Sequence, residues 1–352
     1  MRIVLVGETN QGSRTPQRLR GLGDLGHAVA MVSTTPPGWS YETPPSLAQR
    51  LAYRLRLPLD PAGANLRLLE AVAAGCDVLL LDNARMIRPE TLRAARRVVP
   101  AMRLVWYSED DTMNPVHRTR WLEGCIPQFD LWVTTKSFNA ASAEVPSLGA
   151  RRVLFVDNSF CPHTHAPLTV TDEERRRWGA EISFVGTYEE PRAADLRALA
   201  EAGFQVRVWG NGWWGRMGTH SRLTIEGMPV YDDDYRKVVA ASAINLCFLR
   251  KGNRDLQTCR SLELPAMEAF MMHERNGEMT RLFAPDREVA FFSDTQELIE
   301  GAGRWLADGE SRLAAAAAAR RRVLADGHSH PDRWRQILDA AMEPWSGEGY
   351  PP

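Results

Sequence analysis

The sequence has no excess of charge of either sign and no long apolar run. It contains 43 lysine and arginine residues against 44 aspartate and glutamate residues, a formal net charge of −1 over 352 residues. A nucleic-acid-binding protein needs a basic excess, so this balance argues against nucleic acid as a partner. The chain passes from Met1-Arg2 straight into a strand, without the apolar segment of a signal peptide or a membrane span. The few cysteines, odd in number, lead us to expect a cytoplasmic protein.

Cysteine is also scarce, with five residues and no C-x-x-C pair, which is unlike a disulfide framework or a zinc site. Cys161, His163 and His165 alternate in a proline-flanked loop, but no fourth ligand lies nearby in the sequence, so a linker is favoured over a metal site. The run Asp232-Asp233-Asp234 could hold a divalent ion. It directly precedes an expected helix, however, where aspartates cap free amides and favour the helix dipole. We expect neither a metal site nor a cofactor.

Two phosphate-binding fingerprints are missing as well. Gly7 and Gly12 have the spacing of a P-loop, but Ser13-Arg14 stands where the motif needs Lys-Ser/Thr. The sequence has no G-x-G-x-x-G, and the strand expected at 28–33 ends in Ser and Thr instead of an acid. A P-loop nucleotide hydrolase and a dinucleotide-dependent dehydrogenase are therefore both disfavoured.

What the sequence does have is a regular alternation of short apolar strands and helices. The expected strands are 2–6, 28–33, 77–81, 103–107, 131–134, 153–156, 182–187, 205–209, 244–249 and 269–272. This alternation, in a chain too long for one ordinary core, predicts an α/β fold with two doubly wound parallel sheets. We expect an N-terminal domain over 1–168, a second domain over 169–325, and a final helix and tail over 326–352.

The loop after the expected strand at 244–249 is rich in cationic and polar groups. These residues are Arg250, Lys251, Asn253, Arg254 and Asp255. A helix is expected to begin near Thr258 and to carry Arg260 and Glu263. A strand, a cationic loop and a helix N-terminus in succession are how α/β folds bind phosphate, because free amides and the helix dipole both favour an anion. The alternative interpretation is a solvated turn with scattered charges.

This stretch resembles the C-terminal half of GT-B glycosyltransferases, in particular the CgeB-like family named for spore-coat maturation. That family typically has R-x-F-E-x-x-A-x-G, then a Glu before a helix and a D-x-x-E-L segment. The chain has the corresponding residues Arg260-Ser261-Leu262-Glu263-Leu264-Pro265-Ala266, Glu278 and Asp294-Thr295-Gln296-Glu297-Leu298. Asp255 and Glu263 add an Asp-x7-Glu spacing. The chain departs from the pattern at Glu268, where the family has a glycine that lets backbone approach the donor.

Other segments carry the same resemblance, which extends over most of residues 150–340. Gly186-Thr187 corresponds to the family's "F-x-G" entry to the donor domain, and Gly210-Asn211-Gly212-Trp213 to a second glycine-rich element. Gly327-His328 and the helix expected around 332–340 correspond to the family's closing segment, which in GT-B folds crosses back to the first domain. The resemblance therefore implies two facing Rossmann-like domains, with the nucleotide-sugar bound by the second.

The implied activity is metal-independent transfer of a hexosyl group from a nucleotide-sugar, expected to be a UDP-sugar, to a hydroxyl acceptor. Donor-side residues implied by the resemblance are Gly186, Thr187, Gly210, Asn211, Arg250, Lys251, Arg254, Arg260 and Glu263. Glu263 would bind the ribose hydroxyls and Asp255 would face the donor sugar. The acceptor, which could be a glycan, a natural product or a protein, would lie on the side of Gly7, Glu8 and Gly12.

An inverting enzyme also needs a base, for which Asp110 is the first candidate, ahead of Glu8 and His27. The proline-rich loop 34–45, with Trp39 and Tyr41, is expected beside the acceptor. Two alternatives stay open: a non-catalytic nucleotide-sugar-binding protein of the same fold, and a GT-B-like nucleotide-sugar epimerase. The arginines at 312 and 320–322 also leave open a weak peripheral contact with anionic lipid.

Overall fold

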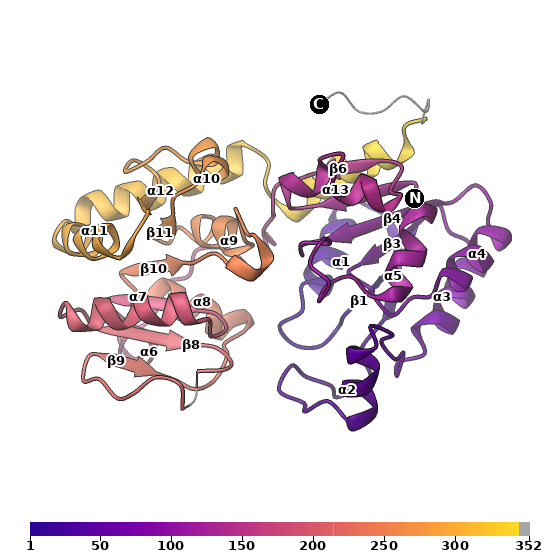
Figure 1. Ribbon diagram of the computed structural model, residues 1–352. Coiled ribbons are helices and arrows are strands. Elements are labelled where there is room, and N and C mark those ends of the chain that lie inside the picture. Colours follow the sequence, from indigo (N-terminus) through magenta and orange to yellow (C-terminus); the bar gives the residue numbers. More distant parts are fainter. Residues whose placement is uncertain (214, 345–352) are drawn as a thin grey trace. The chain divides into compact units, whose positions relative to one another are not determined.

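The computed structural model describes residues 1–213 and 215–344, which form two compact units (Figure 1). Unit 1 comprises Met1–Asp157 and His330–Pro352, and unit 2 comprises Asn158–Ser329. The first division falls before the polar run at 169–179 because the segment that follows Asp157 packs into unit 2. The amide of Asn158 donates to Gln257 Oε1 at 2.8 Å, and Phe160 is buried in the core of unit 2.

Unit 1 contains a six-stranded sheet in the order β2-β1-β3-β4-β5-β6, with every neighbouring pair parallel. Its strands are β1 (Arg2–Gly7), β2 (Ala28–Ser33), β3 (Val78–Asp82), β4 (Arg103–Ser108), β5 (Leu131–Thr134) and β6 (Val153–Phe155). Its helices are α1 (Thr15–Asp24), α2 (Leu47–Arg54), α3 (Ala64–Ala73), α4 (Pro89–Val98), α5 (Arg120–Cys125) and α13 (His330–Met342). The central strands are nearly continuous runs of Val, Ile and Leu because both faces of the sheet are covered.

Unit 2 repeats this plan in the order β12-β11-β10-β7-β8-β9, again with all pairs parallel. Its strands are β7 (Ile182–Val185), β8 (Val206–Trp209), β9 (Leu223–Ile225), β10 (Ile244–Cys247), β11 (Met271–Glu274) and β12 (Ala290–Phe292). Its helices are α6 (Asp172–Trp178), α7 (Glu190–Glu201), α8 (Asp232–Ala241), α9 (Arg260–Ala266), α10 (Gly277–Leu282), α11 (Thr295–Ala307) and α12 (Gly309–Ala325). The expected α/β class with two parallel sheets is therefore confirmed.

Most expected elements are found, with shifts that have local causes. The strand expected at 269–272 begins at Met271, because the amides of Glu268 and Ala269 close the end of α9 by donating to Pro265 and Leu264 carbonyls. The three-residue strands β9 and β12 were not expected. Segments this short carry too little alternation of side chains to be distinguished from loops.

Helix α13 completes unit 1, although it follows unit 2 in the sequence. The indole Nε1 of Trp334 donates to the carbonyl of Arg18 on α1 at 3.0 Å, and its ring lies 5.5 Å from that of Tyr107 on β4. Arg152 binds Glu343 beyond the end of the helix at 2.8 Å. The C-terminal segment is thus part of the first core, as in the expected GT-B arrangement. Of the tail expected after this helix, residues 345–352 lie outside the described residues.

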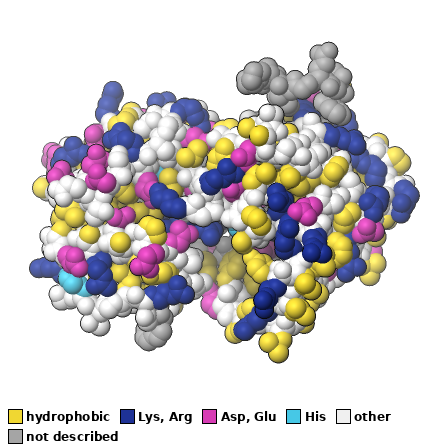
Figure 2. All heavy atoms as spheres, in the orientation of Figure 1, with side chains coloured by type: hydrophobic (Ala, Val, Ile, Leu, Met, Phe, Trp, Pro, Cys, Tyr) yellow, Lys and Arg dark blue, Asp and Glu magenta, His cyan; other side chains and the backbone are white. Residues whose placement is uncertain are grey.

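The surface carries charges of both signs, interspersed on the face seen in Figure 2. Two of the arginines considered for lipid contact are engaged on α12, where Arg320 lies 3.8 Å from Glu268 and Arg322 lies 3.5 Å from Glu288. In the described residues, no helix combines the length and the apolar character needed to cross a bilayer.

Candidate functional site

The first candidate site lies at the carboxyl edge of the sheet in unit 2. In parallel sheets, ligands bind outside the carboxyl ends of the strands, where the strand order reverses. The order β12-β11-β10-β7-β8-β9 reverses between β7 and β10, because β7 leads to β8 on one side and β10 leads to β11 on the other. The loops after β7 and β10 are therefore the ones that face a ligand. They contain the expected donor residues Gly186, Thr187, Arg250, Lys251 and Arg254.

Glycines at this edge allow the loops after β7 and β8 to touch. Gly210 has φ +140°, and a Cβ built on it would lie 2.0 Å from the carbonyl oxygen of Gly186. The amide of Gly186 donates to the Trp209 carbonyl, and the carbonyl of Asn211 accepts from the amide of Tyr188. Two residues expected to approach a ligand are thus required first for backbone packing between loops. Thr187, next to this contact, is exposed.

The cationic loop after β10 is less free than the sequence indicates. The Nε of Arg250 donates to Glu189 Oε1, on the loop after β7, at 3.0 Å, and Lys251 forms an ion pair with Glu274 at the end of β11. Lys251–Asn253 form a single 3-10 turn, and Arg254 follows it with φ +47°. The interpretation as a solvated turn is therefore incomplete, because this loop is linked to both neighbouring strands.

Arg192, in the first turn of α7, was missed by sequence reasoning. It is buried, its NH1 donates to the Thr187 carbonyl at 3.0 Å, and its NH2 lies 3.6 Å from Glu189. Burial is the main factor that lowers the pKa of Arg192; Glu189 opposes this, and the positive charges of Arg260 and Arg250 lower it further. Two other guanidinium groups, those of Arg250 and Arg260, are therefore close enough to Arg192 for their charges to repel its own, and Glu189 lies beside Arg192 and Arg250.

Arg260 is the first residue of α9 and lies with its guanidinium 5.8 Å from the centre of the Tyr235 ring. The Nε atoms of Arg192 and Arg260 are buried and have no hydrogen-bond partner among the described residues. A buried donor without a partner costs about 1–3 kcal/mol. An anion at this edge would supply partners and relieve the repulsion between the arginines. A cation in the first turn of α7, where the helix dipole disfavours it, is the sequence signal that could have identified Arg192.

The two acids of the Asp-x7-Glu spacing are both buried but have different surroundings. Asp255 accepts from Asn253 Nδ2 at 2.7 Å and from the Arg250 amide at 3.3 Å, so it braces the loop instead of capping α9. Glu263 lies inside α9, with the Tyr235 hydroxyl at 3.3 Å and His165 Nε2 at 3.8 Å. His165 thus belongs to this cluster of unit 2 through a contact that sequence spacing could not reveal.

A buried Cys–His–Ser cluster lies beneath the start of α9. Ser261 Oγ is 2.9 Å from His273 Nε2 and 3.9 Å from Cys247 Sγ, and His273 Nδ1 is 2.7 Å from the Glu274 carbonyl. Burial opposes charge on both groups, but attraction between thiolate and imidazolium raises the pKa of His273 and lowers that of Cys247. The cluster ties the first turn of α9 to β10 and β11.

The expectation that the run Asp232-Asp233-Asp234 caps the following helix needs correction. Asp232, Asp233 and Asp234 do not precede α8 but form its first turn; the N-cap is Tyr231, with no side-chain cap. Asp233 pairs with Arg236 at 3.1 Å and Asp234 lies 3.9 Å from Lys237, so they interact along the helix. No cluster of three or more His, Cys, Asp or Glu able to hold a metal is found among residues 1–213 and 215–344.

Glu268 does not lie at the donor edge. It follows α9, at the amino ends of the strands, where it lines a cavity of about 820 Å³ together with Glu181, Arg207 and Arg312. Its φ is +58°, in the left-handed region that glycine adopts most easily, and its amide donates to Pro265. Position 268 thus closes the end of α9, in a backbone conformation that glycine adopts more easily than glutamate. It lies at the opposite edge of the sheet from the expected donor residues.

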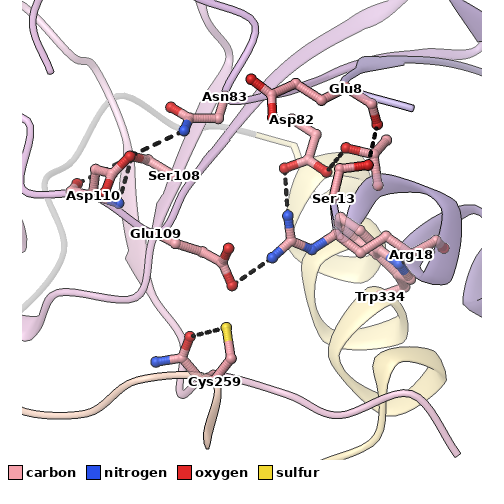
Figure 3. A network of polar contacts seen from close by, with 12 residues as sticks. Glu8, Ser13, Arg18, Asp82, Asn83, Ser108, Glu109, Asp110, Cys259 and Trp334 are labelled. Carbon is pink, nitrogen blue, oxygen red and sulfur yellow. Dashed lines mark hydrogen bonds and ion pairs between the residues drawn. The ribbon is translucent and has the colours of Figure 1, made fainter. Parts of the chain in front are cut away.

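The second candidate site is the carboxyl edge of the sheet in unit 1, where the strand order reverses between β1 and β3. Figure 3 shows the guanidinium of Arg18 between two carboxylates: NH1 is 2.6 Å from Asp82 Oδ1 and NH2 is 2.5 Å from Glu109 Oε1. Burial alone would lower the pKa of Arg18, but Asp82 and Glu109 raise it well above its usual value. Arg18 therefore stays charged and joins α1 to the ends of β3 and β4.

Gly7 and Gly12 shape the loop after β1. A Cβ on Gly7 would lie 2.6 Å from Thr15 Oγ1, whose hydroxyl donates to Asp82 Oδ2 at 2.7 Å, so Gly7 lets α1 pack closely on the sheet. Gly12 has φ +81°, which permits the tight turn between β1 and α1. Glu8 is partly buried and accepts a hydrogen bond from the Tyr41 hydroxyl at 2.6 Å. Gly7, Glu8 and Gly12, the three residues expected on the acceptor side, are therefore adjacent in space.

Asp110 follows β4 and forms an ion pair with Arg85, while Asn83 Nδ2 donates to its Oδ2 at 3.1 Å. Burial alone would raise the pKa of Asp110, but Arg85, His117 and Asn83 outweigh it and lower that pKa. The neighbouring Asp111 accepts hydrogen bonds from the Met113 amide and from Asn139 Nδ2, so it holds the turn that follows β4. His27 precedes β2 at the opposite, amino edge of the sheet, away from the other candidate bases.

In a comparison with known proteins, residues 192–339 match a family model described as Glycosyl transferase-like. No curated protein matches the chain in sequence.

Many solved structures share the fold. They include sucrose-phosphate synthase from Thermosynechococcus elongatus, with 14% identity and a TM-score of 0.61. An alpha-glucosyltransferase in complex with UDP and a 13-mer DNA has 13% identity and a TM-score of 0.64. Anabaena HepE in complex with UDP has 11% identity and a TM-score of 0.60. Each match covers 97% of this chain and 100% of the other. The chain therefore has the GT-B fold, and the family match supports a glycosyltransferase-type protein.

Proposed function

We propose that the protein transfers a hexosyl group from a UDP-sugar to a hydroxyl acceptor without a metal ion, as a CgeB-like GT-B glycosyltransferase. The observation that supports this most is the group formed by Arg192, Arg250 and Arg260 at the reversal of strand order in unit 2. A diphosphate carries at least two negative charges, which would balance the positive charge that remains when Glu189 offsets one of the three guanidiniums. Two of the proteins with the same fold are bound to UDP.

In the proposed reaction, the oxygen of the acceptor hydroxyl bonds to the anomeric carbon of the sugar. The bond from that carbon to the β-phosphate oxygen breaks, and its electron pair leaves with UDP. Negative charge therefore grows on the diphosphate, where preorganised arginines stabilise the transition state more than the ground state. In an inverting reaction a base, proposed to be Asp110, takes the hydroxyl proton. Glu263 is proposed to bind the ribose, and Asp255 to face the sugar.

Calorimetric titration with UDP in a chelator tests the donor part of the proposal. Saturable binding is expected, and Arg192→Gln and Arg260→Gln should each weaken it about ten- to a hundred-fold, since a hydrogen bond to a charged group contributes about 1.5–3 kcal/mol. Arg304→Gln is the matched control, because this arginine is exposed on α11 and pairs with Asp286. Binding that disappears in chelator and returns with manganese would contradict metal independence.

Product analysis by NMR then separates the proposal from its two alternatives. Transfer yields free UDP and a new glycoside when an acceptor is present. A nucleotide-sugar epimerase converts the donor to its epimer with no acceptor, and a non-catalytic binding protein leaves it unchanged. Assays with UDP-glucose, UDP-galactose and UDP-N-acetylglucosamine against a panel of glycans therefore test the transfer directly.

A further inference from the structure

Unit 1 contains a small cavity that the reaction scheme does not use. It has a volume of about 340 Å³ and is lined by Thr9, Asn10, Ser33, Thr35, Pro36, Pro37, Gly38, Trp39 and Arg67. The lining residues come from the loop after β1, the end of β2, the proline-rich loop that follows it, and helix α3. The cavity is thus at the carboxyl edge of the sheet, beside Glu8, where α/β folds bind ligands.

The walls of the cavity are held in place by hydrogen bonds between the two loops. The hydroxyls of Thr9 and Ser33 are 2.7 Å apart, and the Thr9 amide donates to Thr35 Oγ1 at 3.1 Å. On the other side, the Trp39 ring packs edge-on against Tyr41 at 5.4 Å, and Tyr41 donates to Glu8. A site whose walls are already fixed loses little conformational entropy when a ligand binds.

The chemistry of the lining suits a sugar ring. Trp39 is half-buried and supplies an apolar face, against which the C–H groups of a pyranose can pack. Asn10 is more than nine-tenths buried, and its Oδ1 has no hydrogen-bond partner among the described residues. A carbonyl oxygen of this kind accepts from a ligand hydroxyl, and the surrounding Thr and Ser hydroxyls can donate or accept. The volume is near the lower end of small-molecule sites, which fits one ring better than a chain.

Arg67 adds a preference for charge. It is exposed on α3, and its side chain makes no ion pair or hydrogen bond with any residue that the structure describes. A carboxylate or phosphate on the bound ring could therefore pair with it without displacing an existing partner.

From these features we infer that the cavity is the acceptor subsite and binds one pyranose ring of a glycan, with an acidic substituent favoured beside Arg67. The inference rests on the proposed function, because it names the acceptor of that reaction. Of the acceptor classes open from the sequence, it selects a glycan over a protein or a natural product without sugar.

Saturation-transfer difference NMR on the full chain tests this subsite without an assay of transfer. The probes are the methyl glycosides of glucose, galactose, mannose and glucuronic acid at millimolar concentration. At least one should bind saturably, and Trp39→Ala should weaken it at least tenfold while Trp39→Phe keeps most of the affinity. Tyr53→Ala removes an exposed aromatic residue of α2 outside the cavity and should change nothing.

A separate variant, Arg67→Gln, tests the preference for an acidic substituent. Methyl glucuronide should bind about three- to tenfold more tightly than methyl glucoside, and Arg67→Gln should abolish that difference. Equal affinities in the wild type would overturn the acidic preference.

UDP titration of the same samples separates this inference from the proposed function. Normal UDP binding with no saturable binding of any glycoside, or with glycoside binding that Trp39→Ala leaves unchanged, would overturn the subsite alone. Glycoside binding that depends on Trp39 in a protein that binds no UDP would support the cavity and contradict the donor proposal.

Discussion

Glu189 and Arg250 connect the two loops that follow β7 and β10, with Nε and Oε1 3.0 Å apart. The same carboxylate lies 3.6 Å from Arg192, so one acid offsets two of the three arginines of the proposed diphosphate site. A bound diphosphate would have to compete with Glu189 for both guanidiniums.

Glu189→Gln should therefore tighten UDP binding. The interaction is partly solvent-exposed, so the gain is expected to be modest, about two- to fivefold by calorimetry. Glu190→Gln is the control, because the neighbouring Glu190 interacts with Tyr188 and not with these arginines. A weaker UDP affinity in Glu189→Gln alone would show that Glu189 holds the arginines in position, which contradicts competition.

Glu263→Gln should weaken UDP itself by about ten- to a hundred-fold, because a carboxylate that accepts from both ribose hydroxyls contributes about 1.5–3 kcal/mol. The contact with Tyr235 provides a control for an effect on packing. Tyr235→Phe keeps the ring and removes the hydroxyl, so it should leave UDP affinity within about threefold of wild type. UDP binding of normal strength in Glu263→Gln would remove the ribose role.

Asp255→Asn should leave UDP affinity nearly unchanged and lower the rate of transfer, if this acid faces the sugar. The structure supplies a competing role, since Asp255 accepts hydrogen bonds from Asn253 and the Arg250 amide. Asn253→Ala removes one of these bonds while it keeps the carboxylate, and so separates bracing of the loop from chemistry. Equal loss of transfer in both variants, measured beside calorimetry, would assign Asp255 to bracing.

The sequence predicts most of the fold because the central strands are buried on both faces and read as apolar runs, as in Val4–Val6 and Val78–Leu81. The glycine and cationic segments of the donor site are also recognisable, since Gly210 and Arg250 directly follow strands. The sequence does not show which of the charged side chains in these segments form ion pairs with distant residues. Arg250 and Lys251 have partners 61 and 23 positions away in the sequence, Glu189 and Glu274.

Local sequence patterns also do not show whether a residue lies at the amino edge or at the carboxyl edge of a parallel sheet. Glu268 was expected near the donor because it stands where the resembling family has a glycine that lets backbone approach the donor, yet the end of α9 takes it to the amino edge. Arg192, in contrast, was not expected at the donor site but lies there. It is far in sequence from the cationic loop, and the parallel pairing of β7 with β10 brings it close.

Asp110→Asn should lower turnover with little effect on UDP affinity, if Asp110 is the base. Burial opposes ionisation, but Arg85, His117 and Asn83 lower the pKa of Asp110 below its usual value near 4. The carboxylate is therefore charged through the neutral range, and kcat/KM should show no acid limb from this group between about pH 5 and 8. Its ion pair stabilises the fold above the unfolded-state pKa, and this stabilisation is lost as the pH falls through the lower folded-state pKa.

Thermal melting should accordingly show wild type more stable than Asp110→Asn at pH 7, with a difference that shrinks toward pH 4 and below. Turnover of the variant near the wild-type value would reassign the base to Glu8 or favour a retaining route. Glu123→Gln, which removes a partly exposed ion pair with Arg56 elsewhere in unit 1, is the control for a general loss of stability.

Glu268→Gly should stabilise unit 2 without changing the donor site. A side chain with a Cβ at φ +58° is strained relative to glycine by about 1–2 kcal/mol, part of which glycine loses again through its greater freedom in the unfolded chain. We expect a net gain of about 0.5–1 kcal/mol, or roughly 1–4 °C in the melting temperature of the unit. Glu268→Ala is the matched control, since it removes the same carboxylate and its contact with Arg320 but keeps the Cβ. UDP affinity should be unchanged in both variants, because Glu268 lies at the amino edge of the sheet. If the glycine variant melts no higher than the alanine variant, the strain at this helix end is not the reason for the family's glycine; if UDP binding changes, the separation of the two edges is wrong.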